Sequence, residues 1–265
     1  EFIDIGGPTM LRAAAKNHQD VLVLTDPADY ADAIQEIKSG SVSIEFRRKL
    51  AGKVFNLTAA YDAAISRFML GESGENEYPE HYVLSLKKQQ ALRYGENGHQ
   101  SACLYTTADY KGAFGGMKQL QGKELSYNNI RDLDVAWKGV CAYSRFIKNA
   151  EPVSGVDTEG NAVVANFASA AGSVFTIALK HNTPCGAALG KNVLDSYKKT
   201  YNCDSTSIFG GIVGCSSVID EEAALEMSKC FLEVIVAPGF TDEALKVFAA
   251  KKNLRLVVAE IPAED

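Results

Sequence analysis

The sequence predicts an α/β protein built from two successive units. Its 265 residues suffice for one large domain or two smaller ones. Through the second half, stretches with helical periodicity alternate with short β-rich apolar runs, a pattern typical of crossover connections and a mostly parallel sheet. A polar segment rich in turn formers, GESGENEYPE at 71–80, separates this half from the first. We therefore expect units at 1–86 and 87–265.

The composition narrows the classes of function. The chain is 46% hydrophobic and 23% charged, as in ordinary globular proteins. Its formal charge of -6 argues against a nucleic-acid-binding face, although a local basic cluster could still hold a phosphorylated substrate. No apolar run is long enough to span a bilayer, and no signal peptide is recognisable. Six cysteines without a C-x-x-C pair indicate reduced thiols and a cytoplasmic protein.

The first unit reads as α/β. Gly6-Gly7-Pro8 precedes a helical stretch over 9–17, because proline suits a first helical position. The apolar run Val21–Leu24 predicts a buried parallel strand. A helix is expected after Asp26-Pro27, and apolar residues at helical spacing predict one long helix over 43–70. Because the sequence opens on Glu1 and runs straight into a motif, we expect a piece of a longer polypeptide.

The second unit alternates strands and helices. A strand is expected at Ala102–Tyr105 and a helix at 129–147, whose apolar residues recur on one side. β-rich runs follow at 162–167 and 174–179. Further helices are expected near 191–201, 220–231 and 241–250, and further strands near 208–217, 233–237 and 254–259.

The first candidate site surrounds the start of the helix at 9–17. Asp4 and Ile5 precede the two glycines, and Lys16 ends the same helix. Free N–H groups at a helix start attract anions, and glycines let a ligand approach the backbone. The alternative is a simple turn at the glycines, with Lys16 in a favourable interaction with the negative end of the helix dipole.

A second candidate is the segment Leu92–Gln100, LRYGENGHQ. Arg93 beside Tyr94, flanked by glycine and asparagine, could grip a phosphate, because arginine offers a planar fork of donors that matches it. The amide side chains of the segment could bind base or sugar. The alternative is a polar loop with a surface arginine and a capping asparagine.

A third candidate is Lys180–Gly186, KHNTPCG, which follows the apolar run ending at Leu179. Ligands bind at strand ends in open α/β sheets, His181 can take a proton near neutral pH, and Lys180 can stabilise developing negative charge. Adjacent strand residues face opposite ways, so both share one site only if the strand has ended, for which Pro184 argues. The alternative is a structural histidine at a strand end.

Pro184-Cys185 also suggests a zinc deaminase, which uses H-x-E and P-C-x-x-C elements. Position 188 is alanine rather than cysteine, and no H-x-E occurs in the chain. Because the ligand set is incomplete, we expect no catalytic metal.

A fourth candidate combines Ser207–Val213, SIFGGIV, with Glu233 at the start of an apolar run. The glycine pair at Gly210 marks a close backbone approach or a bulge. Glu233 could bind a ribose hydroxyl, or it is an ordinary exposed strand-end glutamate.

Taken together, these motifs resemble the bifunctional purine-biosynthesis family AICAR transformylase/IMP cyclohydrolase. The departures are small: Gly98 stands where the family usually has proline, and Asn182-Thr183 is one of several variants. The matching blocks occur in the family's order and span nearly the whole chain: IDIGGPTMLRAAAKNH at 3–18, LRYGENGHQ at 92–100, KELSYNNIRDLD at 123–134, KHNTPCG at 180–186, SIFGGIV at 207–213 and EVIVAPGF at 233–240.

The resemblance implies two folds and two activities. An incomplete methylglyoxal-synthase-like α/β domain, 1–86, would belong to the cyclohydrolase that closes formyl-AICAR to IMP. A cytidine-deaminase-like α/β/α domain, 87–265, would belong to the transformylase, which moves a formyl group from 10-formyltetrahydrofolate to AICAR without a metal. Family members are roughly twice this length, so the chain alone is expected to complete neither reaction at a normal rate. The transformylase site of the family spans a dimer interface, which implies a homodimer.

Residue roles also follow from the resemblance. Asp4 and Ile5 match nucleotide-binding positions of the cyclohydrolase, and Lys16 matches its proposed proton-transfer lysine. His181 matches the transformylase general base and Lys180 its charge-stabilising neighbour. Five further residues match positions at which the family contacts AICAR: Arg93, Tyr94, Asn129, Gly210 and Glu233. The last position is aspartate in some relatives.

Two other functions stay open. A non-catalytic module could bind AICAR-like nucleotides through Arg93, Tyr94, Gly210 and Glu233 without formyl transfer. A zinc nucleoside deaminase would require bound zinc.

Overall fold

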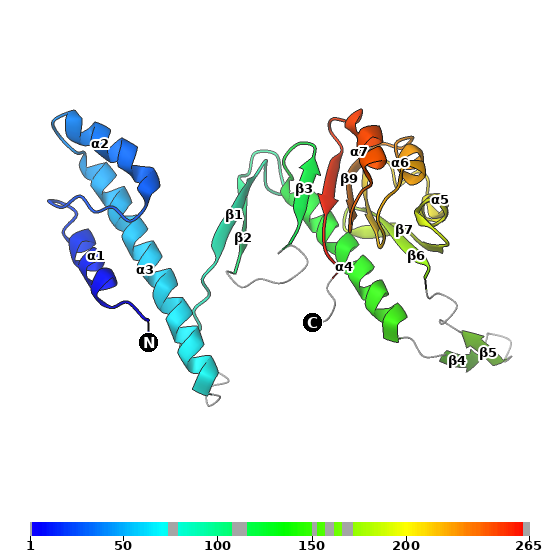
Figure 1. Ribbon diagram of the computed structural model, residues 1–265, viewed down its shortest axis with the longest axis horizontal. Helices are drawn as coiled ribbons and strands as arrows, with labels where there is room; N and C mark the ends of the chain where they lie inside the picture. The colour runs from blue at the N-terminus through cyan, green and yellow to red at the C-terminus, as the bar shows by residue number, and fades with distance from the viewer. Residues whose placement is uncertain are drawn as a thin grey trace. The chain divides into compact units, whose positions relative to one another are not determined.

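The computed structural model describes residues 2–73, 79–107, 116–149, 153–156, 162–165 and 172–261. The chain folds into two compact units, Glu1–Lys87 and Lys88–Asp265. Figure 1 traces the elements of each unit along the chain. Within the described ranges, no helix is both long enough and apolar enough to cross a membrane.

From Phe2 to Ser73, the regular secondary structure of the first unit is helical. It contains α1 (Gly6–Lys16), a short 3-10 turn (Pro27–Asp29), α2 (Tyr30–Lys38) and the long α3 (Ile44–Ser73). The Asp26 side chain accepts the N–H of Ala28 and so begins the helical segment after Pro27. A small cluster of Ala15, Val23, Ala51 and Val54 holds α1 against α3. The helices expected over 9–17, after Pro27 and over 43–70 are thus confirmed. The first one begins earlier than predicted, at Gly6, so the two glycines belong to the helix and Pro8 is its third residue rather than its first.

The strand expected at Val21–Leu24 is wrong. The segment is irregular, and the described part of the first unit contains no strand, so the α/β expectation fails there. Val23 is buried among helical side chains while Val21 is exposed. A strand needs the backbone groups of a neighbour, and the described helices offer none. The connection expected at 71–80 begins later than predicted, because α3 continues to Ser73; positions 74–78 lie outside the described residues.

The second unit is built on a six-stranded sheet with the order β3-β10-β9-β8-β6-β7. Two further pairs of strands, β1-β2 and β4-β5, form separate two-stranded sheets. The strands are β1 (Lys87–Leu92), β2 (Ala102–Thr106), β3 (Lys118–Gln121), β4 (Val153–Val156), β5 (Ala162–Ala165), β6 (Val174–Lys180), β7 (Thr183–Gly190), β8 (Gly211–Cys215), β9 (Leu232–Ala237) and β10 (Arg255–Val258).

The six-stranded sheet is mixed, which corrects the prediction of a mostly parallel sheet. Only the β8–β9 and β9–β10 pairings in it are parallel. β6 runs antiparallel to both β8 and β7, and β3 runs antiparallel to β10. A two-residue turn joins β6 to β7, and such a turn can connect only antiparallel strands.

Helices cover both faces of this sheet, as Figure 1 shows for the second unit. On one face, α4 (Tyr127–Asn149) packs Leu133, Trp137 and Val140 against alternate residues of the central strands. On the other face lie α5 (Val193–Cys203), α6 (Glu221–Met227) and α7 (Asp242–Ala249). Side chains alternate along β9 and so contribute to the hydrophobic cores on both faces of the sheet: Val234 faces α4, and Ile235 faces the other helices. The expected helices and the strands near 102, 174, 208, 233 and 254 are confirmed.

Candidate functional site

A cavity of about 360 Å³ opens in the second unit where β6 ends and β8 and β9 begin. The first turn of α4 closes one side of it. Because β6 runs antiparallel to β8, its carboxyl end lies at the amino ends of the parallel strands. The pocket is lined by Tyr94, Glu96, Ser126, Asn128, Asn129, Arg131, Asp132, Lys180, His181, Asn182, Gly210, Ile212 and Glu233.

The turn between β6 and β7 brings Lys180 and His181 to this cavity. His181 and Asn182 both have positive φ, 53° and 62°, and Lys180 pairs with Thr183 across the turn. This is the geometry of two-residue hairpins of type I′. Asparagine tolerates the left-handed region, whereas histidine costs about 1 kcal/mol there. The strand does end before His181, as predicted.

Pro184 is not what ends that strand. It lies inside β7, an edge strand, where a residue without an N–H is tolerated. Leu179 faces Pro184 and Ala178 faces Gly186, so Cys185 is an extra, bulged residue. The hairpin turn, rather than the proline, explains why adjacent residues reach one pocket.

The backbone at Gly210 anchors Lys180. The Lys180 ammonium donates to the carbonyl oxygens of Phe209 and Gly210 at 3.0 and 2.9 Å. Gly210 has φ of +70°, and a Cβ there would lie 2.7 Å from Lys180 Nζ. Its N–H donates to the Phe231 carbonyl at 2.7 Å. The close approach is therefore confirmed, and the register of β8 against β9 also shifts between Gly211 and Ile212, so the two interpretations hold together.

A carboxylate and an amide form the floor of the cavity, and a buried guanidinium outside the lining lies next to the carboxylate. Asn129 Nδ2 donates to Glu233 Oε2 at 2.7 Å, and Asn129 Oδ1 accepts from the Ser126 N–H and hydroxyl. Arg255 lies 3.9 Å from the same glutamate oxygen and donates to the carbonyls of Lys123 and Glu124. Burial lowers the pKa of Arg255, while the Glu233 charge raises it. The Glu233 carboxylate is thus oriented by Asn129 and Arg255, although its side chain is 41% exposed.

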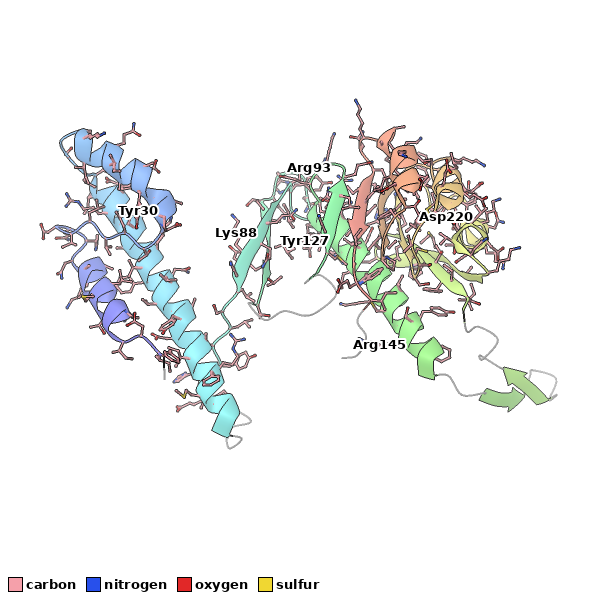
Figure 2. The ribbon with its side chains drawn as sticks, in the orientation of Figure 1. Tyr30, Lys88, Arg93, Tyr127, Arg145 and Asp220 are labelled. Atoms are coloured by element: carbon pink, nitrogen blue, oxygen red, sulfur yellow. The ribbon has the colours of Figure 1, made fainter. Side chains whose placement is uncertain are left out.

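Arg93 and Tyr94 lie at the rim. The Arg93 guanidinium stacks over the Tyr94 ring at 4.8 Å from its centre. The Tyr94 carbonyl accepts the N–H of Tyr127, which joins this loop to the start of α4; Figure 2 labels Arg93 and Tyr127. A hydrogen bond from Ser126, and then the Arg93 charge, lower the pKa of Tyr94. The rim therefore presents a cation beside a polarised phenol.

The sequence-based residues of the second unit gather here. Tyr94, Asn129, Lys180, His181, Gly210 and Glu233 line one cavity, and Arg93 stacks on Tyr94 beside it. Sequence reasoning missed Asn182, Arg131, Asp132 and Glu96 as cavity residues, although all four lie inside the matched motifs. It also missed Arg255, a buried charge within an apolar strand, which was a usable signal.

The candidates of the first unit lie at opposite ends of α1. Asp4 Oδ1 accepts the Gly7 N–H at 3.1 Å, and the Asp4 N–H donates to the Tyr61 hydroxyl at 2.8 Å. Ile5 is 70% exposed. Lys16 lies in the last turn, exposed, and so about 15 Å along the helix axis from its start. Asp4 therefore stabilises the start of the helix, and roles for Asp4, Ile5 and Lys16 in a cyclohydrolase site stay predictions.

The described residues offer no set of side chains that could ligate a metal ion. Among the described residues, no three His, Cys, Asp or Glu side chains are grouped as ligands would be. Cys185 faces the Ala178 carbonyl, and burial raises the pKa of its thiol, which disfavours the thiolate that a metal needs.

The fold and the pocket define an α/β unit with a polar, charge-lined cavity at its strand ends. Comparison with known proteins then gives the family. The model of the AICARFT/IMPCHase bienzyme family matches residues 14–265, and the chain belongs to this family.

Several curated relatives are similar along the whole chain. The bifunctional purine biosynthesis protein PurH of Clostridium acetobutylicum is 52% identical over 266 residues, covering 100% of this chain and 47% of the relative. The proteins of the same name from Clostridium botulinum (strain Hall) and Clostridium kluyveri are 51% and 50% identical, over 98% of the chain and 46% of each relative. The chain thus spans about half the length of these relatives.

Proposed function

We propose that the chain acts in the synthesis of IMP, with its second unit binding AICAR and taking part in formyl transfer from 10-formyltetrahydrofolate. Family membership supports the purine pathway. The single observation that carries the finer proposal is the gathering of Tyr94, Asn129, Lys180, His181 and Glu233 around one cavity. They come from motifs spread over 140 residues of sequence, from 94 to 233.

Nucleotide recognition would use both ends of the cavity. Glu233, oriented by Asn129 and Arg255, can accept hydrogen bonds from ribose hydroxyls. Arg93 at the rim can pair with the phosphate, whose charge the planar guanidinium matches. The cavity volume of about 360 Å³ suits a mononucleotide.

The chemical step would be acyl transfer between nitrogen atoms. The 5-amino group of AICAR is a weak nucleophile because its lone pair is delocalised, so it needs a base as it attacks the formyl carbon. His181 would accept the amine proton, and Lys180 would stabilise the oxyanion of the tetrahedral intermediate. Collapse breaks the bond from carbon to folate N10, and tetrahydrofolate leaves as N10 is protonated. Two backbone carbonyls hold the Lys180 ammonium, which leaves one of its three donors for the oxyanion.

The first unit would belong to the cyclohydrolase, which closes formyl-AICAR to IMP. Asp4 and Ile5 would bind the nucleotide, and Lys16 would transfer a proton. The distance along α1 between them means that Lys16 would serve a different part of the site from Asp4. We also propose a homodimer in the cytoplasm, as the family resemblance implies, without nucleic-acid or membrane partners.

Formyl transfer by the purified chain tests the proposal. AICAR and 10-formyltetrahydrofolate are supplied, folate absorbance is followed, and AICAR binding is measured separately by calorimetry. Turnover that is lost in His181→Ala but kept in His99→Ala, an exposed histidine outside the cavity, supports formyl transfer. Binding without turnover favours the non-catalytic AICAR-binding module instead. Absence of AICAR binding contradicts both.

A further inference from the structure

The turn that carries His181 is clamped by the first turns of α4. The Asn182 N–H donates to Asp132 Oδ1 at 2.7 Å. In a two-residue hairpin the central N–H groups have no partner within the turn, so a carboxylate from elsewhere satisfies this one. Asp132 lies fifty residues earlier in the chain and on a different layer of the fold.

The Asn182 side chain makes a second connection to the same helix. Its carboxamide satisfies both ends when the nitrogen faces Asp132 Oδ1 and the Arg131 carbonyl, at 3.0 and 3.1 Å. The amide oxygen then accepts from Arg131 Nε and Nη2, at 3.1 and 2.8 Å. Arg131 in turn lies 3.4 Å from Glu96 of the Leu92–Gln100 segment. A continuous polar chain thus runs from the rim of the cavity through α4 to the turn.

These contacts fix the orientation of the β6–β7 turn relative to α4, which the backbone of the turn alone does not determine. Two consecutive non-glycine residues at positive φ are uncommon, and such conformations persist where the surroundings over-determine them. Lys180 precedes the turn and is held from the other side by Phe209 and Gly210. The turn is therefore held from two sides, by the residues Phe209 and Gly210 just before β8 and by α4.

We infer that Asp132 is a positioning residue, which holds the β6–β7 turn so that His181 faces the nucleotide cavity. Asp132 does this through the Asn182 N–H, with Arg131 as a second support through the Asn182 side chain. The inference rests on the proposed function for what His181 meets in the cavity, and its first test does not depend on that function.

The chain offers matched variants. Asp132→Ala removes the acceptor of the turn. Asn182→Gly keeps the N–H and the positive φ but loses the links to Arg131, since glycine adopts this conformation freely. Asp134→Ala is the control: it lies two residues further along α4, and its carboxylate pairs with Lys138 at 2.6 Å on the helix surface.

The first readout uses the ligand-free chain and amide NMR. In the wild type and in Asp134→Ala, we expect a slowly exchanging Asn182 amide proton. In Asp132→Ala, its exchange should accelerate about tenfold or more, with the unfolding midpoint within a few degrees of the control. Unchanged exchange of the Asn182 amide in Asp132→Ala would overturn the clamp.

The second readout adds AICAR and follows the His181 ring signals. In the wild type and in Asp134→Ala, AICAR should shift these signals, and in Asn182→Gly, which lacks the support from Arg131, the shift should be smaller. In Asp132→Ala, AICAR should still bind, with affinity within about threefold, but the His181 shift should fall by more than half. A full shift in Asp132→Ala would overturn the positioning role. If AICAR fails to bind even the wild type, the proposed function fails, and the amide experiment alone still decides on the clamp.

Discussion

Asn129 Nδ2 and Glu233 Oε2 lie 2.7 Å apart, which joins the first turn of α4 to the start of β9. The two residues are 104 positions apart in sequence and belong to different motifs. Asn129 is itself fixed by Ser126, so the carboxylate has one preferred orientation. A carboxylate held in this way is preorganised to accept hydroxyl donors from a ligand.

Neutralising Glu233 should weaken nucleotide binding. In Glu233→Gln the shape is kept, but the charge-assisted acceptor is lost, so AICAR affinity should fall about tenfold or more. Calorimetry measures the affinity, and a thermal melt verifies folding. Glu222→Gln, an exposed glutamate in the first turn of α6, is the control and should leave affinity unchanged. Equal affinities in both variants would remove Glu233 from the binding site.

Adding a methyl group at Gly210 should displace Lys180. The Cβ of Gly210→Ala would meet Lys180 Nζ at 2.7 Å and would force a residue with a side chain to keep φ of +70°. The left-handed conformation alone costs about 1–2 kcal/mol, so the free energy of unfolding should fall by at least that amount. Denaturant titration measures it. Gly239→Ala, whose Cβ meets Val218 at an ordinary 3.6 Å, is the control and should change stability little.

Arg255 should matter for stability as well as for the site. Arg255→Met keeps an apolar stem but removes the Arg255 donor from the carbonyls of Lys123 and Glu124, and it leaves Glu233 without its neighbouring cation. The Lys123 carbonyl still accepts from Gln119 Nε2. We expect a loss of about 2 kcal/mol in the free energy of unfolding. The matched exposed change, Lys252→Met, should cost less than about 0.5 kcal/mol. Similar denaturation midpoints for the two variants would contradict this view of Arg255.

Tyr197 offers a pH-dependent prediction. Its hydroxyl is buried without a hydrogen-bond partner in the described part of the chain, and burial raises the pKa of this phenol. Unfolded tyrosine ionises near pH 10, so the folded state holds its proton longer, and stability should fall as pH rises above about 10. Tyr197→Phe should lessen that fall and add up to about 1 kcal/mol at pH 7, since an unsatisfied donor is removed.

Denaturant titrations from pH 7 to 11 check this, with Tyr201→Phe as control. Tyr201 is half-buried beside Tyr197. A stability profile in Tyr197→Phe that parallels the wild type above pH 10 would show that ionisation of other groups dominates there.

Local sequence patterns predicted most elements of the second unit but not the direction of its strands. Apolar runs such as 174–179 and 233–237 identify strands, because burial on both faces selects continuous apolar residues. Strand direction depends on which distant segments pair, and a short run carries no information about that. The same limit explains the error at Val21–Leu24, where a strand-like run has no partner among the described helices.

Part of the candidate site was predictable from the sequence, but its framework was not. Lys180, His181 and Glu233 were found because charged residues at strand ends are unusual enough to notice. Asp132 and Arg131 look like ordinary polar positions of an amphipathic helix, and their contact with Asn182 depends on how α4 lies on the sheet. Asn182 itself carried a local signal, since asparagine favours the left-handed region of a tight turn.

The antiparallel pairing of β3 with β10 bears on how the chain acquires its site during synthesis. Gln121 lies opposite Leu256, so the edge strand β3 can join the sheet only after β10, the last strand of the described chain, has been made. The chain between β3 and β10 is long, so its closure costs more entropy and is slow, and the contacts between the two strands form late in folding. Tyr94 and Asn129 leave the ribosome well before Glu233 and Arg255, and their polar groups must stay hydrated until those partners arrive. A nascent chain that stalls before residue 232 would thus display the rim of the pocket without its floor.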